Sequence, residues 1–133
     1  MEQILTAGRF PFEPDVLDGG VLLIETSEEL LPARDVGWII RALGERGILS
    51  AVHAVLAARP PVSDFTRRPP ADQRARLRAE QRDVIAGLVG RYNPEAVVCV
   101  GVPFGHTRPQ WIVPHGGAVT VDGAARRVVA SYS

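Results

Sequence analysis

The sequence lacks residues on which several classes of protein depend. Its 133 residues include a single cysteine, Cys99, so neither a disulfide framework nor a cysteine metal cluster can form within one chain. Lysine is absent, and the fifteen basic residues, all arginine, balance fifteen acidic ones. A chain with no net charge and a pI near 6.8 has no overall field that attracts a polyanion, which argues against nucleic acid as a partner.

Long apolar runs are also missing. No stretch approaches the roughly 18 apolar residues that a membrane-spanning helix needs, and the N-terminus has no basic segment followed by an apolar signal core. We therefore expect a cytoplasmic protein with no membrane partner. The three histidines are scattered without metal-ligand spacing, so we expect no metal and no other cofactor.

What the sequence does contain is a regular alternation of strand and helix signals. Apolar strands are predicted at 21–25, 52–58 and 96–101, with a short one at 110–113, and amphipathic helices at 32–46 and 71–92. We take the first of these strands as a central one, because its apolar run shows no alternation. Segments 118–121 and 126–130 flank Asp122-Gly123, a strong hairpin signal. This order predicts an α/β fold, with a central parallel sheet and a small antiparallel layer.

The first residues of the chain do not form a complete strand or helix signal of their own. Residues 2–8 suit the last turns of a helix whose earlier turns are absent, because a turn and a half followed by Gly8 and Pro11 does not persist alone. The start of the chain therefore looks cut, and its 133 residues are expected to form one compact domain.

Two polar residues fall where parallel sheets bind ligands, beyond the carboxyl ends of strands. Glu25 ends the first apolar run, and His106 lies in a loop five residues after the third. A carboxylate that accepts a hydrogen bond from one imidazole nitrogen leaves the other free as a general base. The alternatives are that Glu25 is an acidic cap for the following helix and that His106 is a loop histidine satisfied by backbone groups.

A nucleophile is missing from this pair. None of the serines lies in a glycine-flanked turn between a strand and a helix, where its hydroxyl would be exposed; they are Ser27, Ser50, Ser63, Ser131 and Ser133. His53, inside a strand pattern, and His115, in a turn, are expected to be structural. By itself the chain is therefore not a complete hydrolase.

Two segments resemble a known family. Residues 18–25, Asp-Gly-Gly-Val-Leu-Leu-Ile-Glu, resemble the segment in which the LD-carboxypeptidase and microcin C immunity family places its triad glutamate. Residues 101–110, Gly-Val-Pro-Phe-Gly-His-Thr-Arg-Pro-Gln, resemble its triad histidine segment, and Pro-His-Gly at 114–116 stands where the family usually has Pro-Leu-Gly. The Gly-His-Thr-x-Pro form is closer to the microcin immunity branch, whose members are described as MccF-like.

The resemblance implies a swivelling three-layer β/β/α domain that contributes Glu25 and His106 as catalytic residues of a Ser-His-Glu triad. It also implies partners: an N-terminal domain of the same protein that bears the serine, a second copy in a homodimer, and a small peptide or aminoacyl-nucleotide amide as substrate. Residues 1–133 would then be the C-terminal half of a serine carboxypeptidase, with residues 1–17 as the junction segment after the N-terminal domain, and would be inactive alone. The alternatives are an LD-carboxypeptidase of murein tetrapeptide recycling and a non-catalytic binding module with the same fold.

If a second domain covers this one, an apolar patch should be exposed near Glu25 and His106. The aromatics in Pro- and Gly-rich segments are the best candidates to form that patch. They are Phe10, Phe12, Phe104 and Trp111.

Overall fold

The main sheet consists of three parallel strands. The computed structural model describes residues 14–26 and 28–132. Within them, β1 (Val21–Ile24), β2 (Ala54–Ala58) and β3 (Val97–Val102) pair in the order β1-β2-β3. The predicted helix fragment at 2–8 and most of the predicted junction segment lie outside the described residues.

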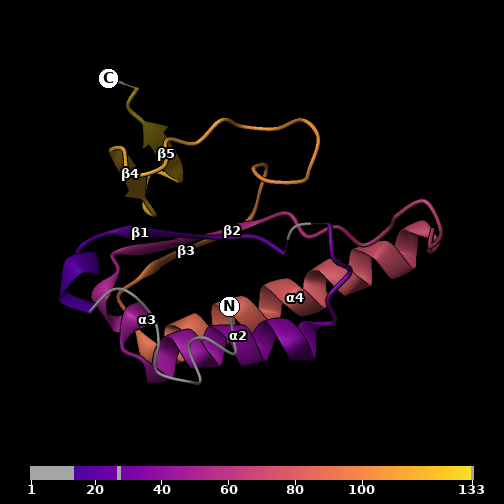
Figure 1. Cartoon of the computed structure of the whole chain (residues 1–133), viewed down its shortest axis with the longest axis horizontal. Helices are drawn as coiled ribbons and strands as arrows, with labels where there is room; N and C mark the ends of the chain where they lie inside the picture. Colours follow the sequence, from indigo (N-terminus) through magenta and orange to yellow (C-terminus); the bar gives the residue numbers. More distant parts are fainter. Residues whose placement is uncertain (1–13, 27, 133) are drawn as a thin grey trace.

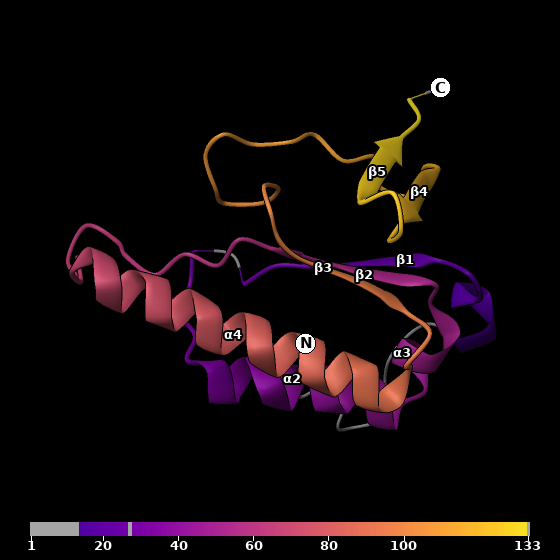
Figure 2. The same ribbon diagram turned by 180° about the vertical axis from the view of Figure 1, so that it is seen from behind.

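Helices cover one face of this sheet and a hairpin covers the other (Figure 1). The helices α2 (Ala33–Glu45) and α4 (Ala71–Tyr92) pack side by side beneath the sheet, and the antiparallel strands β4 (Val119–Asp122) and β5 (Arg127–Ala130) lie above it. The reverse view keeps the same three layers (Figure 2). The predicted α/β fold with a small antiparallel layer is therefore confirmed.

The strand β2 forms the centre of the core. Its side chains alternate between two buried clusters: Val55 and Ala57 face Ile40 of α2, whereas Leu56 on the other face meets Val121 of β4. All four of these β2 and α2 residues are at most 2% exposed. The prediction that residues 21–25 form a central strand is wrong, because β1 lies at the edge of the sheet, where β2 is its one neighbour among the described strands.

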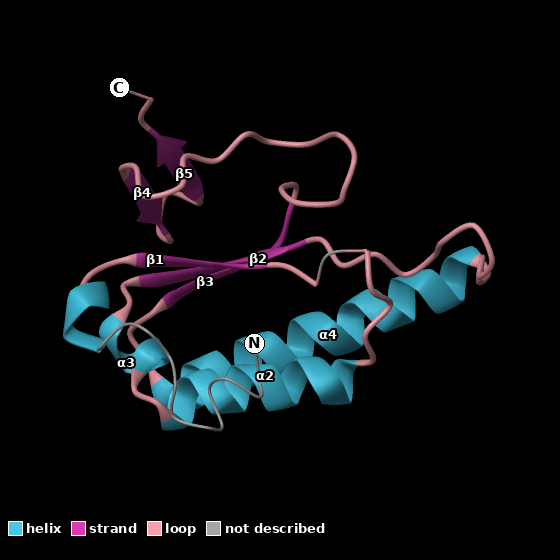
Figure 3. Cartoon of the chain, viewed as in Figure 1, coloured by secondary structure: helices cyan, strands magenta, loops and turns pink. Residues whose placement is uncertain are grey.

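Two short helices that the sequence did not predict precede β1 and β2 (Figure 3). They are the 3-10 helix η1 (Pro14–Leu17) and α3 (Ile48–Ala51). Gly47, at φ 74°, lies in the turn after α2 and is the N-cap residue of α3. Asn93 then ties α4 to this region, because its Nδ2 donates hydrogen bonds to the carbonyls of Leu49 (2.8 Å) and Val52 (2.9 Å).

The long loop between β3 and β4 differs from the prediction. Residues 110–113 are not a strand, because no other strand of the described chain lies along them. The loop is instead fastened at its base, where the amide of Trp111 donates to the carbonyl of Pro103 at 2.6 Å. The hairpin signal at Asp122-Gly123 is confirmed, although the turn there takes four residues and ends at Arg126, whose φ is 51°.

Candidate catalytic pair at the carboxyl edge of the sheet

The sheet brings two loops together at one edge. In the strand register Ile24 lies opposite Ala57, and Ala57 lies opposite Val100, so all three strands end at the same side. Glu25 follows β1 directly, and His106 lies four residues beyond the end of β3. Only β2 lies between β1 and β3, so the loops that follow these two strands reach each other across the end of β2.

Glu25 and His106 are in contact there. One carboxylate oxygen of Glu25, Oε2, accepts a hydrogen bond from the backbone N–H of His106 at 3.2 Å and lies 3.3 Å from the ring nitrogen Nδ1. Both side chains are partly exposed, at 35% for Glu25 and 50% for His106. With Nδ1–H donating to the carboxylate, the tautomer is fixed and Nε2 becomes the nitrogen that can accept a proton.

The close approach of Glu25 depends on Gly105. This residue has φ +73°, and a Cβ built on it would lie 1.6 Å from Oε2 of Glu25. No side chain fits in that space, and the left-handed backbone conformation also favours glycine. The side chain of Gln110 donates to the carbonyl of Gly105 and holds the turn from the other side.

A second carboxylate, which the sequence interpretation missed, lies at the opposite side of the imidazole. Oε2 of Glu28 is 3.2 Å from Nε2 of His106, and the Glu28 side chain is 80% exposed. Each ring nitrogen of His106 therefore faces a carboxylate oxygen, Nδ1 that of Glu25 and Nε2 that of Glu28. The available signal was spacing, since Glu28 follows Glu25 by three residues on the same loop.

The remaining histidines take no part in this pair. His53 lies within 3.4 Å of the carbonyl of Val121 through Nε2, and His115 is exposed in the loop before β4. Across residues 14–26 and 28–132, no group of three His, Cys, Asp or Glu side chains is arranged to hold a metal ion. In the same residues, no helix is long and apolar enough to cross a bilayer.

The serines that the structure describes do not reach His106. Ser50 donates to the carbonyl of Gly47 at 2.8 Å, and neither Ser63 nor Ser131 makes a side-chain hydrogen bond to the imidazole. Ser27 and Ser133 lie outside the described residues. In the part of the chain that the structure describes, no serine hydroxyl is therefore hydrogen-bonded to the imidazole of His106.

Part of the predicted apolar patch is present. Trp111 is 52% exposed and Ile112 is 82% exposed, both in the loop that carries His106. The prediction for Phe104 is wrong: it is 7% exposed, because it packs with Val102 of β3 and Val121 of β4 under the hairpin. The two N-terminal candidates, Phe10 and Phe12, lie outside the described residues.

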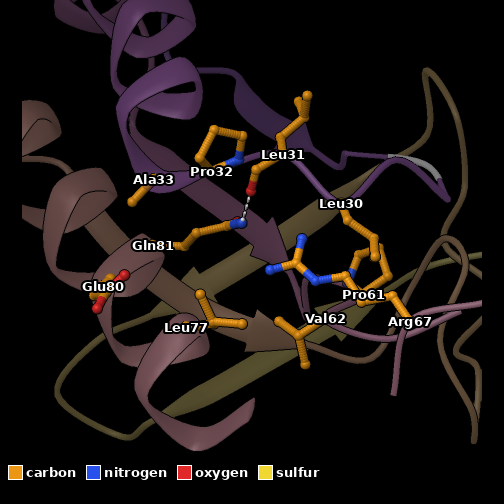
Figure 4. Close-up of a pocket in the computed structure, with 10 residues that line it drawn as sticks. All are labelled: Leu30, Leu31, Pro32, Ala33, Pro61, Val62, Arg67, Leu77, Glu80 and Gln81. Carbon is orange, nitrogen blue, oxygen red and sulfur yellow. Dashed lines mark hydrogen bonds between the residues drawn. The ribbon is translucent and has the colours of Figure 1, made fainter. Parts of the chain in front are cut away.

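A small cavity of about 220 Å³ lies apart from the pair, where the start of α2 meets α4 (Figure 4). Its walls include Val62 and Leu77, and Arg67 and Glu80 also line it. The buried Gln81 donates from Nε2 to the carbonyl of Leu31 at 2.6 Å, so its amide closes the segment before α2 onto α4. We interpret this cavity as a packing gap, a seam between the segment before α2 and α4, which the hydrogen bond of the buried Gln81 joins.

Comparison with known proteins places the chain in a family. The model of the LD-carboxypeptidase C-terminal domain matches residues 2–121. Among solved structures, the crystal structure of an MccF-like protein from Streptococcus pneumoniae in complex with AMP has the same fold, with a TM-score of 0.69 and 21% sequence identity. The likeness covers 98% of this chain and 34% of that one, so this chain spans about a third of its structural neighbour. A search of curated proteins gave no match. Because the family model matches most of its length, this chain belongs to the family of LD-carboxypeptidase C-terminal domains, which is a peptidase family.

Proposed function

We propose that this chain supplies the general base and its orienting carboxylate to the Ser-His-Glu triad of a serine carboxypeptidase. The observation that carries the proposal is the contact of Glu25 with both the ring and the backbone N–H of His106. A catalytic imidazole needs a fixed tautomer and a fixed orientation, and a carboxylate at Nδ1 provides both. Membership of a peptidase family supports the same reading.

In this proposal the serine comes from a separate N-terminal domain, and residues 1–133 form the C-terminal half of the enzyme. Nε2 of His106 takes the serine proton as the oxygen attacks the carbonyl carbon of an amide. The same proton then goes to the leaving amine as the C–N bond breaks, and water hydrolyses the acyl-enzyme. Glu25 stays ionised throughout and stabilises the imidazolium that forms between these steps.

Glu28 has to leave Nε2 before this cycle starts. While the Glu28 carboxylate lies at Nε2, it occupies the position that a serine hydroxyl needs in order to give its proton to this nitrogen. The ion pair is solvent-exposed on the glutamate side, and exposed pairs of this kind are worth at most about 1 kcal/mol. A docked serine hydroxyl can therefore displace it.

The substrate in this proposal is a small peptide or an aminoacyl-nucleotide amide, as in microcin C immunity. The Gly-His-Thr-x-Pro form of residues 105–109 favours that branch, and the structural neighbour was solved in complex with AMP. Cleavage of murein tetrapeptides by an LD-carboxypeptidase is the second candidate, favoured by the family description. A cytoplasmic location and a homodimer of the complete enzyme belong to the same proposal.

The test compares the chain alone with the chain joined to a serine-bearing domain of the family. We expect no hydrolysis of an aminoacyl-adenylate amide or a muropeptide by the purified chain, and hydrolysis when the serine domain is supplied. In the active form, His106→Ala should lower the rate by about 10⁶, the loss typical of a triad histidine. His115→Ala, in the same loop, is the matched control and should leave the rate unchanged.

Two results would overturn the proposal. Turnover by the chain alone that disappears with His106→Ala would mean that the nucleophile lies within these residues. Full activity of the joined protein after His106→Ala would mean that the pair is not catalytic, and the non-catalytic binding module would become the better account.

A further inference from the structure

A second cavity, lined by arginines, opens on the helix-covered side of the sheet. It has a volume of about 520 Å³ and lies between α4 and the carboxyl ends of β2 and β3. Arg59 enters it from the segment after β2, and Arg78 and Arg82, one helical turn apart on α4, line the facing wall. This places three guanidinium groups around one hollow.

The charges of this cavity are not balanced by its own walls. No acidic residue lines it. Arg82 forms an ion pair with Asp83 at 3.0 Å, but Arg59 and Arg78 have no ion pair with any described residue. The Nε of Arg78 is also fully buried without a hydrogen-bond acceptor. A buried cationic donor without a partner costs free energy, so its presence here calls for an acceptor that the described residues do not provide.

The rest of the wall is apolar. Ala75, Ala79 and Ile85 of α4 and Val100 of β3 line it beside the arginines. Small-molecule sites combine such an apolar lining with a few convergent polar groups, and their volumes run from about 300 to 1,000 Å³. The cavity thus has the size and the lining of a site for a small organic anion.

This cavity is distinct from the catalytic pair. The helix α4, which forms one wall, lies beneath the sheet, whereas the loop that carries His106 rises on the hairpin side (Figures 1 and 2). It also differs from the seam of Figure 4, with which it shares Gln81. An occupant of the arginine cavity therefore would not have to touch Glu25 or His106.

We propose that the arginine cavity binds the phosphoryl group of a phosphorylated small molecule. Two guanidinium groups without an ion pair among the described residues, and a third nearby, match the charge of a phosphate dianion better than that of a single carboxylate. Arg78 and Arg59 hold the phosphate oxygens, and the wall of Ala75, Ala79 and Ile85 holds the organic part. The inference does not rest on the proposed peptidase activity.

Isothermal titration of the chain with inorganic phosphate, phenyl phosphate, acetate and chloride at matched ionic strength tests the proposal. We expect one phosphate per chain, tighter binding of phenyl phosphate because of the apolar wall, and no comparable heat with acetate or chloride. Tighter phenyl phosphate binding indicates a phosphate ester as the occupant, and equal binding indicates free phosphate. Acetate binding as strong as phosphate, or no phosphate binding at about 10 mM, overturns the proposal, because site-specific anion recognition should exceed general attraction to arginine.

Variants locate the site. Arg78→Gln should weaken phosphate binding by about tenfold or more, since it removes charge-assisted hydrogen bonds. Arg91→Gln removes the same charge at the far end of α4 and should bind as the unmodified chain does. His106→Ala should also bind normally, so a failed peptidase assay and a failed binding assay remain distinguishable.

The melting temperature of each variant shows whether a loss of phosphate binding comes from loss of the fold. Arg78→Gln removes a buried donor without a partner, so its melting temperature should be no lower than that of the unmodified chain. If Arg78→Gln does not fold, Arg59→Gln tests the same site from the other wall. Equal phosphate affinity of the Arg91→Gln chain and either cavity variant overturns the assignment.

Discussion

Gly105 is the residue on which the geometry of the candidate site depends most directly. In Gly105→Ala the new Cβ would occupy the position of the Glu25 carboxylate, so we expect the carboxylate to move and its hydrogen bonds to His106 to break. Gly116→Ala is a matched control: it has a similar φ of +70° but nothing within 4 Å of its Cβ. The control should lose about 1–2 kcal/mol of stability from backbone strain alone.

The measurement is the NMR spectrum of the His106 ring nitrogens together with urea unfolding. Gly105→Ala should change the tautomer signal of His106 and lose more stability than Gly116→Ala. Unchanged His106 signals in Gly105→Ala would mean that Glu25 does not depend on the glycine for its position.

Asp64 gives a prediction about pH. Its Oδ1 accepts three hydrogen bonds, from the amide of Arg67 at 2.6 Å and from the amide and hydroxyl of Thr66 at 2.7 and 2.8 Å. These bonds, first that from the Arg67 amide and then those from Thr66, lower the pKa of the Asp64 carboxyl below its usual value. Because the pKa is lower in the folded state, the stabilisation is present above the unfolded pKa of about 3.9 and disappears as pH falls through the folded value.

We therefore expect Asp64→Asn to unfold more readily than the unmodified chain at pH 7, and the difference to shrink below about pH 4. Urea unfolding between pH 7 and pH 2 measures it. Thr66→Val keeps the Asp64 carboxylate but removes the hydroxyl that donates to it. Its loss of stability at pH 7 should therefore have the same sign as that of Asp64→Asn and be smaller. A difference between Asp64→Asn and the unmodified chain that stays constant with pH would contradict the account.

At the scale of elements, the contact of α2 with α4 depends on a glycine of α2. A Cβ at Gly44 would lie 2.3 Å from the ring of Tyr92, the last residue of α4, whose hydroxyl donates to Glu45. The ring therefore sits directly on the backbone of α2. Gly44→Ala should destabilise the fold by about 1–3 kcal/mol, because an extra carbon forces this packed seam apart.

Gly87→Ala provides the matched control in the other helix. Nothing lies within 4 Å of the Cβ position of Gly87, which is exposed in the C-terminal half of α4, before its last turn. The same substitution should therefore stabilise the chain, by about 0.5–1 kcal/mol, since alanine loses less backbone entropy in a helix. Chemical denaturation of both variants is the test, and changes of the same sign would contradict the packing argument.

At the scale of the whole molecule, the exposed side chains of the loop after β3 have the character of an interface. Trp111 and Ile112 leave a large apolar area uncovered in the loop that carries His106. In our proposal the serine-bearing domain covers them. Trp111→Ser combined with Ile112→Ser should then weaken binding of a separately supplied serine domain by about tenfold or more, as for the central residues of an interface.

Phe65→Ser is the control, because Phe65 is 96% exposed in a different loop, before α4. Titration calorimetry with the serine domain should show no change for Phe65→Ser. The stability of the isolated chain should stay within about 0.5 kcal/mol in both cases, as for other surface substitutions. Equal weakening by both changes would remove the evidence for an interface at the His106 loop.

The sequence alone determined the features that local patterns control. The helix predicted at 71–92 has the observed bounds of α4, because Pro70 and Asn93-Pro94 restrict the backbone on either side. The α/β order was readable from its alternating apolar segments. The meeting of Glu25 with His106 was predictable too, since the rule that parallel strands end at one edge needs only their order along the chain.

The tertiary structure decided what depends on distant neighbours. Whether 110–113 forms a strand depends on a pairing partner, and the chain folds without one there. Phe104 is buried only because the hairpin lies over it, and Glu28 reaches His106 only because the loops after β1 and β3 converge. The arginine cavity joins residues from β2, β3 and α4. Such contacts arise from packing between elements far apart in sequence, and a local pattern contains no record of them.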